Sequence, residues 1–214
     1  MGIAERKQRE KETQQRVRRE QILDAAKRVF HTRGFSVATV EDIAKEAELS
    51  PAALYLYFKN KDDIYVSLNL QLLEYLSGRL DILSTREDID AEGKIEVLKD
   101  LLCDVYHFDP LILINLFHLQ ASDGIENLPP ERISELNALA RKSLQSLARI
   151  FDQGKAEGRL ADYPSIALAD IVWIIFTGAV LWEESKRMIN PDKNYLKPTL
   201  GMALDIFKKG IMNP

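Results

Sequence analysis

The sequence contains a single cysteine, Cys103, among its 214 residues. One thiol excludes an internal disulfide bond, so the fold must be stabilised by a hydrophobic core. A hydrophobic content of 46% is enough to build such a core. Sparse cysteine is typical of proteins in a reducing compartment, and we expect a cytoplasmic location.

Catalytic and cofactor motifs are also missing. The chain has no HExxH, GxSxG, GxGxxG or Walker sequence, the patterns that position a zinc ion, a nucleophilic serine, a dinucleotide or a nucleotide phosphate. Cys103 and His107 lie four residues apart on one helical face, but two ligands without a third do not make a metal site. We therefore expect no enzyme activity, no cofactor and no metal.

Long hydrophobic runs are absent as well. The first 20 residues are charged throughout and lack the apolar stretch of a signal peptide. The most membrane-like run, Ile171 to Trp182, has 12 uncharged residues, whereas a membrane-spanning helix needs about 20. We expect a buried helix there and no membrane partner.

Positive charge is not in excess, because the net charge is -4, but the charges are distributed unevenly. Residues 1–66 carry 13 Lys and Arg against 11 Asp and Glu, whereas residues 67–214 carry 16 against 22. A polyanion responds to the local field of a basic patch more than to the net charge of the whole chain. The N-terminal part is therefore a candidate for binding nucleic acid.

Helical periodicity runs through nearly the whole chain, and no segment has the alternation of a β-strand. Apolar spacing, N-terminal caps and Pro or Gly breaks predict helices over residues 17–30, 39–47, 51–58, 61–83, 94–107, 110–121, 130–158, 164–188 and 195–211. The predicted fold class is all-α.

The second and third predicted helices are short and are joined by a three-residue turn, Glu48 to Ser50. Thr39 and Ser50 are placed to cap the two helices, and Pro51 suits the first position of the third. A longer bracing helix followed by two short ones is the layout of a helix-turn-helix, whose second short helix enters the major groove of DNA.

The third predicted helix combines an apolar side with a phenolic side. Leu54 and Phe58 lie four residues apart and are expected to face the core, which leaves Tyr55 and Tyr57 exposed. A tyrosine hydroxyl can donate to a phosphate while its ring packs on the sugar, and Lys61 would add a positive charge beside them. This pattern predicts a surface that binds the DNA backbone.

The segment RREQILDAAKRVFHTRGFSVATVEDIAKEAELSPAALYLYFKNKDDIY resembles the N-terminal DNA-binding domain of the tetracycline-repressor (TetR) family of bacterial transcription regulators, over about residues 16–66. The resemblance includes the ILDAA core, the Thr39 cap and the LYLYFKNKDDI ending. It implies a basic N-terminal arm (1–15), a helix-turn-helix domain (16–66), and a helical effector-binding and dimerisation domain (67–214). It further implies phosphate contacts by Thr39, Tyr55, Tyr57 and Lys61, and base-facing positions at Ser50, Pro51, Ala52 and Ala53.

Two positions depart from the family pattern. Glu48 stands where the turn usually has glycine, and a left-handed backbone there would cost on the order of 1 kcal/mol. Ala52 and Ala53 stand where glycine and threonine are frequent, and no Arg, Asn or Gln lies in residues 50–58. Because bidentate base contacts are missing, we expect modest discrimination per base pair and a preference for thymine, whose methyl group alanine can contact.

The resemblance also implies a homodimer, in which two recognition helices read a palindrome. Apolar stripes on the last two predicted helices are candidates for the interface: Ile171, Ile174, Ile175, Gly178, Leu181, Trp182, Leu196, Leu200, Leu204 and Phe207. The alternative is that these stripes face the core of their own protomer.

A small apolar effector, acyl-bearing or aromatic, is the expected ligand of the C-terminal domain. The candidates for its pocket are polar or aromatic residues among apolar ones in the middle helices: Cys103, Tyr106, His107, Asn115, Phe117, His118, Trp173 and Thr177. Ordinary core packing is the alternative for each of them.

The predicted function is that of a repressor that leaves its DNA operator when the effector binds, and the sequence leaves the opposite polarity open. Two other functions also stay open. One is a DNA-binding protein of this fold without ligand control, such as a chromosome or division factor, and the other is a helical interaction module. The arm, residues 6–19, either reaches DNA or forms a solvated, partly helical tail.

Overall fold

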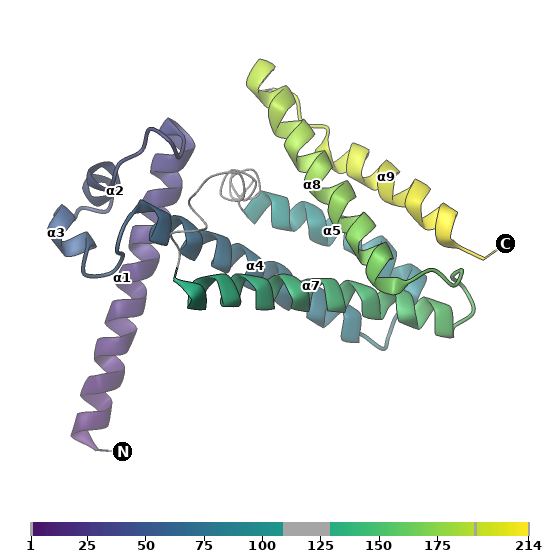
Figure 1. Ribbon diagram of the computed structural model, residues 1–214, viewed down its shortest axis with the longest axis horizontal. Helices are drawn as coiled ribbons and strands as arrows, with labels where there is room; N and C mark the ends of the chain where they lie inside the picture. The colour runs from purple at the N-terminus through teal and green to yellow at the C-terminus, as the bar shows by residue number, and fades with distance from the viewer. Residues whose placement is uncertain (1, 109–128, 191, 214) are drawn as a thin grey trace. The chain divides into compact units, whose positions relative to one another are not determined.

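The structure is a computed structural model that describes residues 2–108, 129–190 and 192–213 (Figure 1). Within these ranges the chain is helical, and the only β-type pairing is an isolated bridge between Leu160 and Met212. The predicted all-α fold class is confirmed. The chain divides into two compact units, Met1–Leu68 and Asn69–Pro214.

Helix α1 (Ile3–Arg33) is longer than predicted, because it begins well before residue 17. No proline or glycine interrupts this segment, and bonds between side chains four residues apart support it, such as Arg6 Nε to Glu10 Oε1 at 3.0 Å. The residues expected to form a separate arm are therefore continuous with the first helix of the domain. The helix ends at Gly34, whose φ of 76° suits glycine and whose N–H bonds to the Phe30 carbonyl.

Helices α2 (Val40–Glu46) and α3 (Pro51–Leu54) form the helix-turn-helix. The predicted third helix was too long, since α3 ends at Leu54 and continues as a turn. The Leu56 and Tyr57 amides bond to carbonyls three residues back, at 3.3 and 2.9 Å, and such bonds tighten the last turn of a helix. The recognition element is thus one helical turn followed by a tight turn.

The core of the first unit lies between α1, α2, α3 and the start of α4 (Lys61–Thr85). Ile43, Ala44 and Leu54 are fully buried, and Phe58 is 1% exposed. This burial places Leu54 and Phe58 on the inner side of the recognition element, as the sequence predicts. The opposite side is therefore free to face a ligand.

The second unit contains the continuation of α4 with α5 (Ala91–Phe108), α7 (Pro130–Ala156), α8 (Ser165–Ile189) and α9 (Leu196–Ile211). Helix α8 packs against α7 and α9, and α5 packs against α7 and α9 (Figure 1). These helices match the predicted ones to within a few residues. The predicted helix 110–121 lies outside the described residues.

Helix α8 is the most apolar of the long helices in the described ranges. Its segment Ser165–Arg187 is long and apolar enough to cross a membrane by length and composition, and about two-fifths of its most apolar window is buried. Helix α8 packs on α7 and α9, so one apolar face lies in the core of the second unit. The high hydropathy arises because a second apolar face lies on the surface of the protomer.

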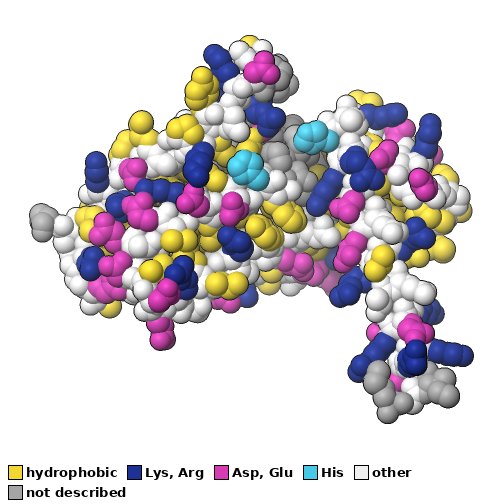
Figure 2. All heavy atoms as spheres, turned by 180° about the vertical axis from the view of Figure 1, so that it is seen from behind, with side chains coloured by type: hydrophobic (Ala, Val, Ile, Leu, Met, Phe, Trp, Pro, Cys, Tyr) yellow, Lys and Arg dark blue, Asp and Glu magenta, His cyan; other side chains and the backbone are white. Residues whose placement is uncertain are grey.

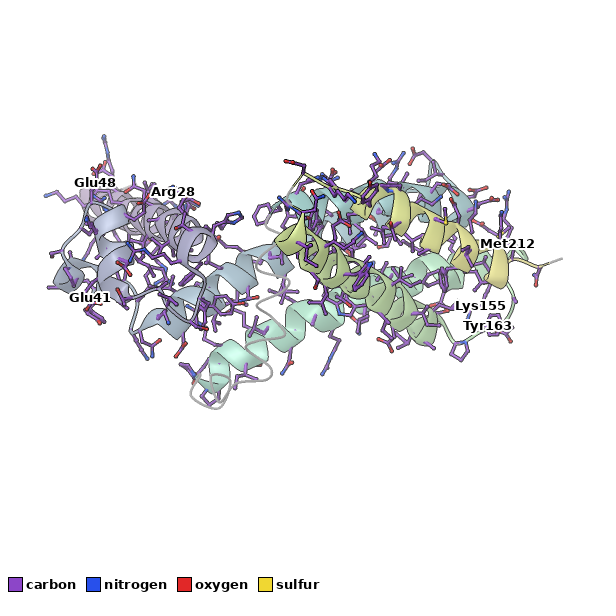
Figure 3. The ribbon with its side chains drawn as sticks, turned by 90° about the horizontal axis from the view of Figure 1, so that it is seen from above. Arg28, Glu41, Glu48, Lys155, Tyr163 and Met212 are labelled. Carbon is purple, nitrogen blue, oxygen red and sulfur yellow. The ribbon has the colours of Figure 1, made fainter. Side chains whose placement is uncertain are left out.

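The loop between α7 and α8 is tied to the end of the chain. The Ala161 amide bonds to the Ile211 carbonyl at 2.9 Å, and Lys155 Nζ donates to the Tyr163 carbonyl at 3.2 Å. Figure 3 shows Lys155, Tyr163 and Met212 together at this end of the unit. These bonds fix where α8 and α9 begin and end relative to α7.

Candidate functional site

The exposed side of the recognition element carries most of the predicted DNA contacts. Ser50, Pro51 and Ala52 are exposed, Ala53 and Tyr57 are half-buried, and the Tyr55 side chain is 50% exposed. This placement brings the predicted base-facing and tyrosine positions onto one short surface. Leu56, which sequence reasoning missed, is 83% exposed between the two tyrosines. The signal for it was the apolar alternation at positions 54, 56 and 58. A helix buries positions 54 and 58 on one face, which leaves Leu56 outside the core.

The two cap residues present hydroxyl groups at the starts of α2 and α3. Thr39 Oγ1 accepts the Asp42 amide at 3.1 Å, and Ser50 Oγ accepts the Ala53 amide at 3.2 Å. Each cap uses an acceptor lone pair, which leaves the hydroxyl hydrogen able to donate to a phosphate or a base. Both residues are exposed, so the caps that define the helices also fit the predicted contacts.

Asp42 completes the cap of α2. Its Oδ2 accepts the Thr39 amide at 3.2 Å, and its Oδ1 pairs with Arg33 at 2.7 Å. The hydrogen bond with Thr39, together with the Arg33 charge, holds the pKa of Asp42 below its ordinary value. The carboxylate therefore stays ionised at neutral pH, and the Thr39 cap stays formed.

Lys61 is placed differently from the expectation that its ammonium projects toward DNA. Its Nζ donates to the carbonyls of Phe35 at 2.7 Å and Ala38 at 3.0 Å, lies 3.5 Å from that of Ser36, and sits over the Phe35 ring. An ammonium has three hydrogens to donate, so a phosphate contact would replace one of these bonds. In this geometry Lys61 braces the loop that leads into Thr39.

Arg19 is a positioning residue that sequence reasoning missed. Its Nη1 donates to the Tyr57 carbonyl at 2.5 Å, and its guanidinium lies over the Phe58 ring, 4.2 Å from the centroid. These contacts hold the turn after α3 against α1. Its only signal in the sequence was a basic residue one turn before the apolar stripe of the first helix.

The turn between α2 and α3 has the strain that the sequence predicts. Glu48 has a φ of 54° and is the one non-glycine residue with positive φ in the described ranges. Figure 3 shows Glu48 on the first unit with Arg28 and Glu41. The neighbouring Glu46 pairs with Arg28 at 2.6 Å, which ties the end of α2 to α1. The turn therefore keeps its geometry without the usual glycine.

Five of the eight predicted effector residues lie in the described part of the chain. Cys103, Tyr106 and Thr177 are buried, Trp173 is half-buried and His107 is exposed. The remaining three, Asn115, Phe117 and His118, lie outside the described residues. In the described part of the chain no three His, Cys, Asp or Glu side chains gather where a metal could bind.

Two of the buried residues of this set, Tyr106 and Thr177, have hydrogen-bond partners within the protein. Tyr106 donates its hydroxyl to Glu184 and accepts from Arg187 at 3.2 Å. Burial, followed by the bond to Glu184, raises the pKa of Tyr106 to about 12. Thr177 Oγ1 donates to the Trp173 carbonyl at 2.8 Å, and burial raises the pKa of the Cys103 thiol. Tyr106 and Thr177 are therefore bonded within the protein, and the Tyr106 and Cys103 side chains are neutral at physiological pH.

The interface prediction is wrong for the leucines of α9. Leu196 is 2% exposed, and Leu200 and Leu204 are fully buried within the protomer. Phe207 is half-buried and its ring meets Phe151 edge-on at 5.9 Å. The physical reason is that α9 packs on both α5 and α8, so its regular leucine stripe is needed inside.

The α8 residues of the same prediction lie outside the protomer core. Ile171, Ile174, Leu181 and Trp182 are 41%, 66%, 45% and 63% exposed, Gly178 is exposed and Ile175 is half-buried. On α9 the exposed apolar side chains are instead Met202 and Ile206, each 66% exposed. The apolar surface of α8 and α9 is therefore large, but only its α8 part matches the predicted residues.

Comparison with known proteins identifies the first unit. Residues 22–68 match the sequence profile described as bacterial regulatory proteins, tetR family. The fatty acid metabolism regulator protein of Bacillus subtilis (strain 168) is 27% identical over 94% of this chain and 98% of its own length. The negative transcriptional regulator IcaR of the Staphylococcus aureus biofilm operon is 21% identical over 89% of this chain and 99% of its own.

Solved structures of such regulators share the fold of the whole chain. PfmR from Thermus thermophilus superposes with a TM-score of 0.72 at 20% identity, covering 88% of this chain and 97% of its own. FadR from Bacillus subtilis, solved in complex with stearoyl-CoA, superposes with a TM-score of 0.67 at 22% identity. The match covers 90% of this chain and 98% of the FadR chain. The capped helix-turn-helix and the matched profile agree that the first unit contains a DNA-binding domain of the kind found in bacterial regulatory proteins of the tetR family, and the solved structures show that the chain has the fold of such regulators.

Proposed function

We propose that this regulator is a cytoplasmic repressor that binds a palindromic operator as a homodimer and leaves it when a small apolar effector binds. The observation that carries the DNA-binding part is the two-sided recognition element. Leu54 and Phe58 are buried on one side, while Ser50, Tyr55 and Leu56 are exposed on the other. A surface of this kind suits a groove lined by phosphates, sugars and base edges.

The proposed contacts divide by chemistry. Thr39, Tyr55 and Tyr57 donate to phosphates, because Thr39 caps the start of α2 and the two tyrosines lie in the turn that follows α3. Ser50 and Ala52 meet base edges, and Leu56 adds an apolar side chain next to them. Apolar contact favours the thymine methyl group, so the operator should be rich in thymine at the contacted steps.

The proposed dimer uses the exposed face of α8, extended by Met202 and Ile206 of α9. Six large apolar side chains of α8, at positions 166, 171, 174, 181, 182 and 189, stand at least 41% exposed, and water-exposed patches of this kind mark association surfaces. A twofold dimer would place two recognition elements about 34 Å apart, in successive major grooves.

The proposed effector is an acyl-bearing molecule that enters the second unit. Two observations support this class: the second unit has an apolar interior, and the similar Bacillus subtilis FadR was solved with stearoyl-CoA. Helix α4 begins in the first unit and continues into the second. It is the element through which an effector would change the geometry of the recognition elements.

Selection of bound duplexes from a random DNA pool by the full-length protein tests the DNA-binding part. We expect a palindrome with half-sites about one helical turn apart and thymines at the contacted steps. Tyr55→Phe should weaken binding to the selected duplex about three- to tenfold, the effect of one hydrogen bond. Failure to enrich any sequence would overturn the proposal in favour of a helical interaction module.

Titration of the bound duplex with stearoyl-CoA tests the effector part. Release of DNA at concentrations that leave the protein folded supports ligand control by an acyl compound. DNA binding that stays unchanged with this and with shorter acyl thioesters contradicts the acyl class. Tighter DNA binding on addition of the thioester would reverse the proposed polarity.

A further inference from the structure

We propose that the N-terminal extension of α1 is a second DNA-binding surface, whose basic stripe binds phosphates of the duplex flanking the bases read by the recognition element. The stripe consists of Lys7, Lys11, Gln14 and Arg18. This inference rests on the DNA-binding part of the proposed function and adds a surface that the helix-turn-helix does not include.

The stripe continues a face of α1 that is buried further along the helix. Positions 7, 11, 14, 18, 22, 25 and 29 are spaced by three or four residues, so they lie on one face of the helix. On this face Ile22 and Ala25 are fully buried and Val29 is 6% exposed. The face is thus apolar where the domain covers it and basic where α1 extends beyond the domain.

The charge of the stripe has a single sign. Glu5 and Glu12 lie on the opposite side of the helix, and Glu10, at the edge of the stripe, pairs with Arg6 at 3.0 Å. Glu12 accepts from Gln8 at 2.7 Å. Figure 2 shows Lys and Arg side chains projecting from the end of α1 that carries the N-terminus. The acidic residues are therefore occupied or turned away, and the stripe faces outward as a basic surface.

The stripe begins beside the recognition element. Arg19, next to Arg18, bonds to the Tyr57 carbonyl and lies over Phe58, so this part of α1 adjoins the turn that follows α3. From residue 18 to residue 7 the helix extends roughly 16 Å, at 1.5 Å per residue. A DNA duplex held by Tyr55 and Tyr57 would have its flanking phosphates within the reach of lysine side chains along this length.

Double-stranded DNA is the partner that the chemistry of the stripe favours. Lysine and arginine at regular intervals on a helix match a row of phosphates, and counterion release adds affinity. Membrane-surface helices need a large apolar side opposite the basic one, and the segment 5–16 has no large apolar residue. The stripe is therefore built for a polyanion and not for a lipid surface.

The experiment compares two double variants of the full-length protein that each remove two positive charges. Lys7→Gln with Lys11→Gln changes the stripe, and Arg9→Gln with Arg16→Gln changes the opposite side of the same helix. The probe is a duplex selected by the wild-type protein, with 10 base pairs of flanking DNA added on each side and in a second form trimmed to the selected core. Binding is followed by fluorescence anisotropy over a range of salt concentrations.

We expect the stripe variant to bind the flanked duplex at least tenfold more weakly at physiological salt. The slope of log K against log salt should fall in magnitude by roughly 0.9 for each phosphate that the variant no longer neutralises. On the trimmed duplex the stripe variant and wild type should differ much less, and the opposite-side variant should resemble wild type on both. Circular dichroism should show the same helix content for all three proteins.

Each of the following results would overturn the inference. Equal losses in the two variants would show a general effect of net charge, and an unchanged slope in the stripe variant would show that its lysines neutralise no phosphate. A wild-type protein that binds no selected duplex would overturn the DNA-binding proposal as well. Wild-type binding with an unaffected stripe variant removes only the inference about α1.

Discussion

At the scale of single residues, the DNA-binding unit combines one strained position with several fixed ones. Glu48 has a positive φ, and Lys61 and Arg19 hold the loops on either side of the helix-turn-helix by bonds to backbone carbonyls. The residues that would touch DNA are thereby positioned by residues that do not. Substitutions at the positioning residues should change the stability of the fold, whereas substitutions at the residues that would touch DNA should change DNA affinity.

Replacing Glu48 by glycine should stabilise the protein. The left-handed backbone costs an L-residue on the order of 1 kcal/mol, and glycine avoids most of it. We expect the free energy of unfolding, measured in urea, to rise by roughly 0.5–1 kcal/mol in Glu48→Gly. Glu48→Ala removes the same charge but keeps the strain, so it should show no such gain. Equal gains in the two variants would mean that charge, and not backbone strain, is the cause.

Replacing Lys61 by methionine should weaken the fold of the first unit. The carbonyls of Phe35 and Ala38 lose their donor, and an unsatisfied polar group costs roughly 1–3 kcal/mol when buried. Lys59→Met is the control, since Lys59 is exposed two residues earlier. Thermal unfolding and DNA affinity should both be measured. If Lys61→Met reduced DNA affinity at unchanged stability, a phosphate contact would explain it better than the bracing role.

At the scale of elements, the same apolar character has opposite uses in α8 and α9. The leucines of α9 fill the space against α5 and α8, whereas α8 keeps six large apolar side chains at the surface. An apolar stripe is therefore evidence of burial, but not of what buries it. Only the packing of neighbouring helices separates the protomer core from an interface.

Introducing charge on the exposed face of α8 should dissociate the proposed dimer. Ile174→Asp combined with Trp182→Asp should give a monomer in sedimentation experiments, with its helix content retained. Its DNA affinity should fall about a hundredfold or more, because two linked half-sites are lost. Ile82→Asp is the matched control, since Ile82 is 67% exposed on α4 and Ile174 is 66% exposed on α8. A dimer that survives the double change would place the interface elsewhere.

At the scale of the whole molecule, the proposed regulation requires that DNA and the effector shift the same equilibrium between two conformations of the protein. Helix α4 belongs to both compact units, and each unit has its own core. An effector in one unit can lower DNA affinity in the other only by binding the two conformations with different affinity. The coupling free energy between the two ligands can therefore be measured either from effector binding or from DNA binding.

Operator DNA should weaken effector binding by the same factor by which the effector weakens DNA binding. Linkage requires this equality, and a typical coupling of 1–3 kcal/mol corresponds to a factor of about 5 to 150. Calorimetric titration of stearoyl-CoA into the free protein and into its DNA complex gives one factor, and DNA titration with and without the thioester gives the other. Unequal factors would show that the thioester acts by another route, such as unfolding the protein.

Most of the fold was predictable because the determining signals are local. Thr39 and Ser50 cap their helices, Gly34 ends the first, and Leu54 and Phe58 turn inward, all as spacing and residue type predict. The length of α3 was not predictable in this way. The Tyr57 amide bonds to the carbonyl three residues back, and this bond replaces the four-residue bond that would continue the α-helix.

The sequence by itself determined which segments are helical, apart from the start of α1 and the length of α3, and it determined the helix-turn-helix and the strained turn at Glu48. These features follow from periodicity, caps and φ preference, which act over a few residues. The tertiary structure alone decided that the α9 leucines lie inside, that the Lys61 ammonium binds loop carbonyls, and that the basic stripe of α1 continues a buried face. These outcomes depend on which segments, distant in the sequence, pack against one another. The local pattern of residues along the chain does not specify such contacts.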